Sequence, residues 1–126
     1  MIRPTWDDWF VREVEAATVD GPSLWYLGAT GFVVRTAAAT VYVDPYFGVG
    51  GHRPDAVRMC PVPMDPADAT RCDAVVVTHE HADHMHPPSY GPLVERSGAA
   101  LYAPETCLSD PDYDGELRLP RTDGSR

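Results

Sequence analysis

Three consecutive valines lead directly into a cluster of histidines and acids in VVVTHEHADHMHP, residues 75–87. The apolar run between Asp73 and Thr78 predicts a short strand that is buried on both faces, as strands with parallel neighbours are. Four of the chain's five histidines lie in the loop that follows. The sequence therefore predicts a layered fold in which polar side chains gather at the end of a central strand.

Further periodic segments surround this strand. The spacing of Thr5 and Asp8 fits a capping box, and apolar residues at helical intervals predict an amphipathic helix over residues 5–17, with its aromatics packed on a sheet. The other expected elements are antiparallel strands at 24–28, 32–36 and 40–44, a Gly- and Pro-rich loop at 45–63, a short helix at 65–70, a helix at 90–96 and a strand at 99–103. Together they predict an α/β (α+β) fold, a mixed sheet with flanking helices.

Length and charge narrow the class of protein. A chain of 126 residues with 44% hydrophobic content fits one domain, with residues 109–126 as a polar tail that holds at most a brief strand at Leu117 and Leu119. The net charge of -9 and the lack of a basic stripe disfavour nucleic-acid binding. Because the chain has neither a signal peptide nor an apolar run of bilayer length, we expect a cytoplasmic protein without membrane contact.

The histidine cluster has the chemistry of a metal site. Imidazole and carboxylate groups, here from His79, His81, Asp83 and His84, are ligands that zinc prefers and that manganese or iron accepts. After an extended strand, the loop can turn the first two side chains toward one point and the last two toward a neighbouring point. Two adjacent metal ions lower the pKa of a water molecule and clamp substrate oxygens, which favours hydrolysis. The alternative is a polar surface loop without metal.

The motif THEHADH, residues 78–84, resembles the HxHxDH signature of the metallo-β-lactamase superfamily. The resemblance implies an αββα sandwich and metal-assisted hydrolysis. It also implies that His79 and His81 bind the first of two divalent metal ions, zinc or manganese, and that Asp83 and His84 bind the second. Asp83 is then the candidate catalytic residue that steers the attacking water.

Segments outside the motif are similar to one branch, the L-ascorbate-6-phosphate lactonase-like hydrolases. The similar segments are LWYLGATGF at residues 24–32, VDPYFG at 43–48, CDAV at 72–75 and APETC at 103–107. The resemblance implies a small, anionic lactone, ester or phosphoester substrate. Asp44 is expected beside the metal loop, accepting an imidazole N–H, or else is an ordinary turn residue. His52 and Arg53 are weaker candidates for substrate binding, with a solvated loop pair as the alternative.

In the resembled superfamily a second, similar half supplies further metal ligands, whereas this chain has no histidine after His86. The sequence therefore predicts the N-terminal half of the sandwich, a single truncated domain over residues 1–126 with one bare sheet face. Two functions stay open. One is a metal-dependent hydrolase, completed by a homo-oligomer or a complementing C-terminal half. The other is a non-catalytic metal-binding or interaction remnant, and whether the chain is an enzyme is left open.

Overall fold

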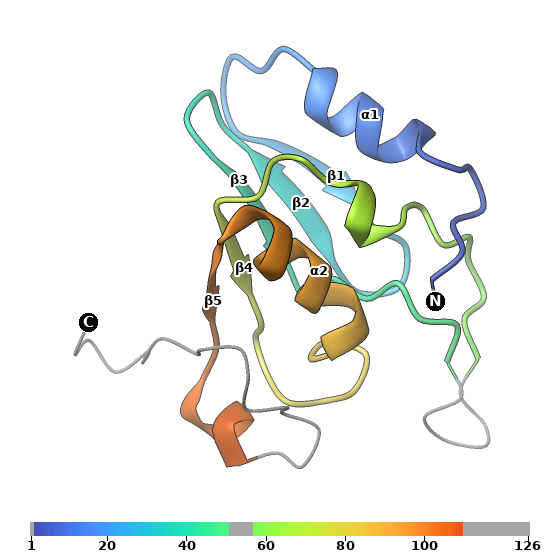
Figure 1. Ribbon diagram of the computed structural model, residues 1–126, viewed down its shortest axis with the longest axis vertical. Helices are drawn as coiled ribbons and strands as arrows, with labels where there is room; N and C mark the ends of the chain where they lie inside the picture. The colour runs from blue at the N-terminus through green and yellow to red at the C-terminus, as the bar shows by residue number, and fades with distance from the viewer. Residues whose placement is uncertain (1, 51–56, 110–126) are drawn as a thin grey trace.

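The computed structural model describes residues 2–50 and 57–109, and one mixed sheet lies at its centre. The five strands follow the chain order β1-β2-β3-β4-β5, antiparallel from β1 to β3 and parallel from β3 to β5. The elements are α1 (Trp9–Ala16), β1 (Ser23–Tyr26), β2 (Phe32–Arg35), β3 (Thr40–Val43), the 3-10 helix η1 (Pro66–Asp68), β4 (Ala74–Val76), α2 (Pro87–Ser97), β5 (Ala100–Tyr102) and the 3-10 helix η2 (Glu105–Ser109) (Figure 1). The predicted meander, the βαβ step and the mixed α+β sheet are confirmed.

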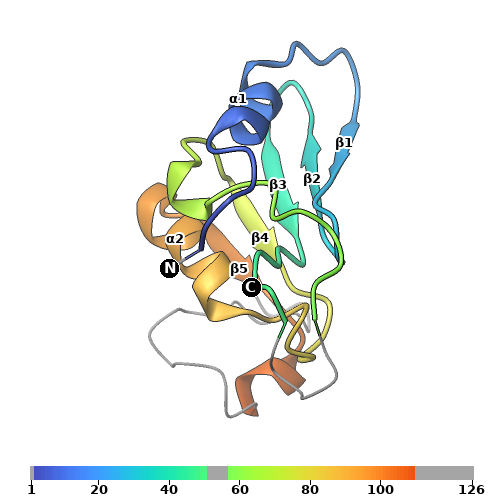
Figure 2. The ribbon, with the colours of Figure 1, turned by 90° about the vertical axis from the view of Figure 1, so that its right-hand side faces the viewer.

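Both α-helices lie on the same side of the sheet (Figure 2). Strand side chains alternate between the two faces, so every second residue points toward these helices. Removing each such apolar side chain from water contributes about 1.5–3 kcal/mol before the entropic cost of ordering it. The fully buried residues of this layer include Val33, Tyr42, Val75 and Leu101 from the strands, Val14 from α1 and Leu93 from α2.

The opposite face of the sheet is apolar but is not covered by the described residues. Its strand positions are half-buried or exposed, with Leu24 and Tyr26 at 60% and 56% exposure. The expectation that residues 73–78 are buried on both faces is therefore wrong for the described chain, because Val75 is buried while Val76 is only half-buried. The uncovered face comprises Leu24, Tyr26, Phe32, Val34, Val41, Val43, Ala74, Val76, Ala100 and Tyr102.

Helix α1 begins later than the sequence indicates. It starts at Trp9, and Asp8 makes no side-chain capping bond because its carboxylate instead accepts a hydrogen bond from Arg12 Nε at 2.6 Å. Asp7 has a φ of 50°, which interrupts a right-handed helix, and the Thr5 N–H donates to the carbonyl of Val62. The predicted start at Thr5 is therefore wrong.

The packing of the aromatics is also only partly as expected. Phe10 is buried and Trp25 packs against the core, but Trp6 and Trp9 are 44% and 60% exposed and contact each other edge to face. The expected strand at Leu117 and Leu119 and the tail beyond residue 109 lie outside the described residues. None of the described helices is long and apolar enough to cross a membrane.

Candidate functional site

Asp44 follows the last residue of β3 and turns the chain out of the sheet. Its φ of 47° lies in the left-handed region, which aspartate tolerates better than most residues do. Its N–H donates to the Val76 carbonyl at 2.7 Å, which extends the parallel pairing with β4 by one residue. A Cβ atom at Gly31 would overlap the Asp44 carbonyl oxygen, so glycine is required at that close approach.

The Asp44 side chain is buried, and hydrogen bonds satisfy both of its oxygens. Oδ1 accepts the Thr78 N–H at 2.7 Å, and Oδ2 accepts the Thr78 hydroxyl, also at 2.7 Å. The same Oδ2 lies 2.8 Å from Nδ1 of His84. A buried carboxylate is tolerated when it is hydrogen-bonded in this way, and the contacts join the end of β3 to the loop after β4.

This network assigns the proton positions on two imidazole rings. The Thr78 hydroxyl donates its single proton to Asp44. It can therefore only accept a hydrogen bond from Nδ1 of His79, which lies 2.9 Å away. Nδ1 of His84 likewise donates to Asp44. In a neutral ring the proton then sits on Nδ1 and the lone pair on Nε2, as a metal-binding imidazole requires.

Three imidazole rings lie against one another. The ring centroids of His79 and His81 are 4.6 Å apart, and those of His79 and His84 are 4.0 Å apart. The backbone closes a turn here, since the N–H groups of His84 and Met85 both donate to the His81 carbonyl. Met85, only 3% exposed, anchors the loop in the core.

The two acids of the loop point to different places. Asp83 Oδ1 lies 3.7 Å from Nε2 of His84, and the Thr30 hydroxyl donates to the Asp83 carbonyl at 2.7 Å. Glu80 instead accepts from the Thr106 hydroxyl; a backbone N–H and that hydroxyl lower the pKa of Glu80. Of the two acids in this loop, Asp83 therefore lies beside the histidine rings, whereas Glu80 is hydrogen-bonded elsewhere.

The donor set fits a divalent metal ion chemically, because imidazole nitrogens and a carboxylate are ligands that such ions accept, and the hydrogen bonds at Nδ1 of His79 and His84 direct Nε2 toward a ligand. Within residues 2–50 and 57–109, however, no three histidine, cysteine, aspartate or glutamate side chains share a point close enough to hold an ion together. The rings are adjacent without forming a complete coordination sphere. The assignment of His79, His81, Asp83 and His84 as metal ligands stays a prediction.

Other predicted site residues have different outcomes. His52 and Arg53 lie outside the described residues. His86 precedes α2 and is hydrogen-bonded through Nδ1 to the Ser89 hydroxyl, as expected for a loop residue outside the motif. Sequence reasoning missed Thr78 and Thr30, whose only signals are a hydroxyl two residues after β4 and a threonine between two glycines of the β1–β2 turn.

Comparison with known proteins decides the family. The Beta-lactamase superfamily domain matches residues 39–117, more than half of the chain. This chain belongs to that superfamily. The match includes β3, Asp44, β4 and the whole histidine loop, so the sheet corresponds to half of a metallo-β-lactamase fold.

Individual relatives support the same superfamily, but they are longer than this chain. The chain is 26% identical over 131 residues to the probable L-ascorbate-6-phosphate lactonases UlaG of Salmonella heidelberg (strain SL476) and Salmonella paratyphi B, matching 83% of this chain. It spans only 37% of the length of those relatives. Igni18, a metallo hydrolase from Ignicoccus hospitalis, shares the fold with a TM-score of 0.52 at 19% identity, covering 81% of this chain and 40% of its own.

Proposed function

We propose that this chain provides one half of a metal-dependent hydrolase in which His79, His81, Asp83 and His84 bind one or two divalent cations, zinc or manganese. The substrate class is a small anionic lactone, ester or phosphoester. Support comes from the superfamily match and from the UlaG relatives, which are named as probable lactonases of L-ascorbate 6-phosphate. The chain carries a net charge of -9. The negative charge of such a substrate must therefore be balanced by groups inside the site rather than by a broadly basic surface.

One observation carries the proposal, the shared hydrogen-bond network of Asp44, Thr78, His79 and His84. Metal-binding histidines commonly donate their second ring N–H to a carboxylate, which fixes the tautomer. Here one carboxylate, 5% exposed, fixes two adjacent rings with Nε2 left for a ligand. Such outer partners hold ring orientation and raise ligand basicity.

In the proposed reaction each side chain has a separate role. Bound cations would supply Lewis acidity and lower the pKa of water into the neutral range. Asp83, whose side chain is 40% exposed beside His84, would accept a proton from the attacking water. Thr30 holds the backbone carbonyl of Asp83 and thereby the position of that carboxylate.

The uncovered apolar face of the sheet supports a second layer. A large exposed apolar surface on a folded domain marks an interaction site, and two sheets pack face to face about 10 Å apart. We propose that a complementing half, or a second copy of the chain, covers this face and adds the ligands that the described residues do not supply.

Cation binding and turnover on the same preparation test the function. Zinc and manganese titrations followed by calorimetry are expected to show saturable binding that His79→Ala or His84→Ala weakens at least tenfold. Glu80→Gln is the matched control, because Glu80 is in the same loop but hydrogen-bonds to Thr106. Lactone and phosphodiester hydrolysis should require the cation, and cation affinity unchanged in both histidine variants would refute the site.

A specific observation favours the alternative of a non-catalytic metal-binding or interaction remnant. The described side chains do not converge on a common ion, and the sheet face that would carry a second layer is open. Weak cation binding without any turnover, combined with tight association through the open face, would favour this alternative.

A further inference from the structure

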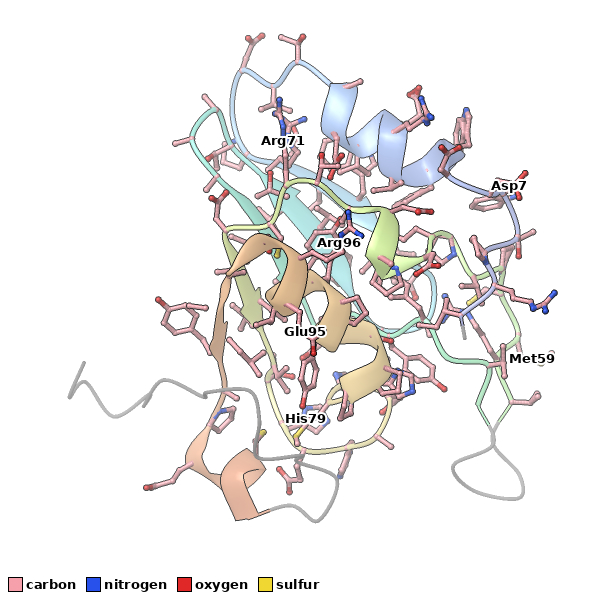
Figure 3. All side chains as sticks on the ribbon, in the orientation of Figure 1. Asp7, Met59, Arg71, His79, Glu95 and Arg96 are labelled. Carbon is pink, nitrogen blue, oxygen red and sulfur yellow. The ribbon has the colours of Figure 1, made fainter. Side chains whose placement is uncertain are left out.

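A cavity of about 500 Å³ lies at the end of the sheet opposite the histidine loop. It is open to solvent and is bordered by the β2–β3 turn, by the segment that precedes β4 and by the last turn of α2. Figure 3 shows Arg71 near one end of the molecule and His79 near the other, with Arg96 on α2. Since a strand rises by about 3.3 Å per residue, Asp73 and Thr78 are separated by roughly 16 Å, and the cavity is a separate site.

The lining of the cavity is basic in an acidic chain. Arg35, Arg71 and Arg96 line it against the single carboxylate of Asp73, which gives the lining a formal charge of +3 - 1 = +2, whereas the whole chain carries -9. Among the described residues, none of these arginines forms an ion pair with a carboxylate. The Glu15 carboxylate lies beside the lining and accepts the N–H groups of Thr70 and Arg71. The Asp73 carboxylate instead accepts the Thr40 N–H at 2.7 Å. A concave basic surface focuses positive potential on whatever enters it.

Arg35 is the fixed element of the cavity. Its side chain reaches from β2 to the end of α1, where Nη1 donates to the carbonyls of Val14 and Ala17 at 2.7 Å each. The residue is 7% exposed, and its Nε is buried without a hydrogen-bond partner in the described part of the chain. A guanidinium is always charged, and a buried charge without a counter-ion is costly. An anion in the cavity would offset that cost.

Neighbouring groups can complete an anion site. Thr36 Oγ1 accepts the N–H groups of Ala38 and Ala39, at 3.2 and 3.1 Å, which leaves its hydroxyl proton for another acceptor. Arg71 and Arg96 are exposed, and their guanidinium groups can present two parallel N–H donors to an oxyanion. Burial raises the pKa of Cys72 to about 11, so this thiol adds no negative charge at neutral pH.

We propose that this cavity binds a phosphate dianion, either free or as part of a small phosphorylated molecule, at a site distinct from the histidine loop. A phosphate monoester carries up to two negative charges on three terminal oxygens, which matches the charge of the lining and its three guanidinium groups. The volume falls in the range of small-molecule sites and exceeds what one phosphate fills. The cavity can therefore admit the rest of a small metabolite.

Calorimetric titrations with inorganic phosphate and with glucose 6-phosphate, at constant ionic strength and without added metal, test the site. Saturable binding of either probe is expected, and tighter binding of the sugar phosphate identifies a phosphorylated molecule rather than the free ion. Arg71→Gln and Arg96→Gln should each weaken binding about tenfold, the loss of one charge-assisted hydrogen bond. These two arginines are exposed, so both variants should fold.

Two controls fix the location. Arg12→Gln removes an exposed arginine that pairs with Asp8 on α1 and should leave phosphate affinity unchanged. His79→Ala should also leave it unchanged, because the histidine loop is at the other end of β4. Absence of saturable binding, wild-type affinity in both cavity variants, or loss of binding in His79→Ala would overturn the proposal.

Discussion

Replacing Asp44 by asparagine is expected to reverse the proton positions on two histidine rings. The carboxamide oxygen can still accept the Thr78 N–H, but an NH2 group then takes the place of Oδ2. The Thr78 hydroxyl would accept from that NH2 and donate its own proton to Nδ1 of His79. Nδ1 of His84 would likewise become an acceptor. Both rings would then carry the proton on Nε2, the atom proposed to bind metal.

The stability cost of each Asp44 variant follows from the same contacts. Asparagine exchanges three charge-assisted hydrogen bonds for neutral ones, a loss of about 1 kcal/mol each and about 3 kcal/mol together. Alanine leaves the Thr78 N–H, the Thr78 hydroxyl and the His84 ring without their acceptor and must also hold a φ of 47°. We expect Asp44→Ala to cost about 4 kcal/mol, a large part of the stability of a domain this size.

Long-range proton–nitrogen NMR of the imidazoles, recorded without metal at pH 8, reads the tautomers directly. The wild type should show Nδ1–H for His79 and His84, and Asp44→Asn should show Nε2–H for both. His81 has no described hydrogen bond to Asp44 and serves as the internal control. Nε2–H forms of both rings in the wild type would refute the assigned network, as would identical spectra of the two proteins.

Three further perturbations have defined outcomes. The free energy of unfolding should fall as pH rises from about 9 to 11, because burial raises the pKa of Cys72 to about 11 and also raises that of Tyr42, while the unfolded thiol ionises near 9.0. Urea titrations at pH 8 and 10.5 should show a smaller fall for Cys72→Ala, and an equal fall would contradict this. Thr30→Val should cost about 1 kcal/mol and speed amide exchange in the histidine loop, since the hydroxyl donates to Asp83; unchanged exchange would argue against that role. Val41→Lys puts a charge on the open sheet face and should reduce both the binding of a hydrophobic dye and the association with a covering half or second copy; unchanged dye binding and association would contradict the role of this face.

The sequence predicts the sheet well because its signals are local. Alternating β-branched and aromatic residues identify β2 and β3, and Gly98, with a φ of 69°, ends α2 where a left-handed residue is needed. The start of α2 is three residues earlier than expected, because Pro87 occupies the first turn, where a missing N–H costs nothing. The start of α1 fails for a different reason, since Asp8 pairs with Arg12 instead of capping.

The candidate site was predictable only in part. The histidine spacing indicates that the rings lie together, and the structure brings His79, His81 and His84 into contact. The link from Asp44 to Thr78 spans 34 residues and depends on the parallel pairing of β3 with β4, which no local pattern encodes. A hydroxyl also has no ligand signature in a sequence, so its part in orienting His79 emerges only from coordinates.

X-ray absorption spectroscopy of the zinc-loaded chain tests the central claim most directly. If the histidine loop holds the cation, the first shell should contain imidazole nitrogens at about 2.0 Å, with the outer-shell scattering typical of the ring. The imidazole signal should diminish in His79→Ala and persist in Glu80→Gln. A first shell made of oxygen alone, or an imidazole signal indifferent to the loss of His79, would contradict it.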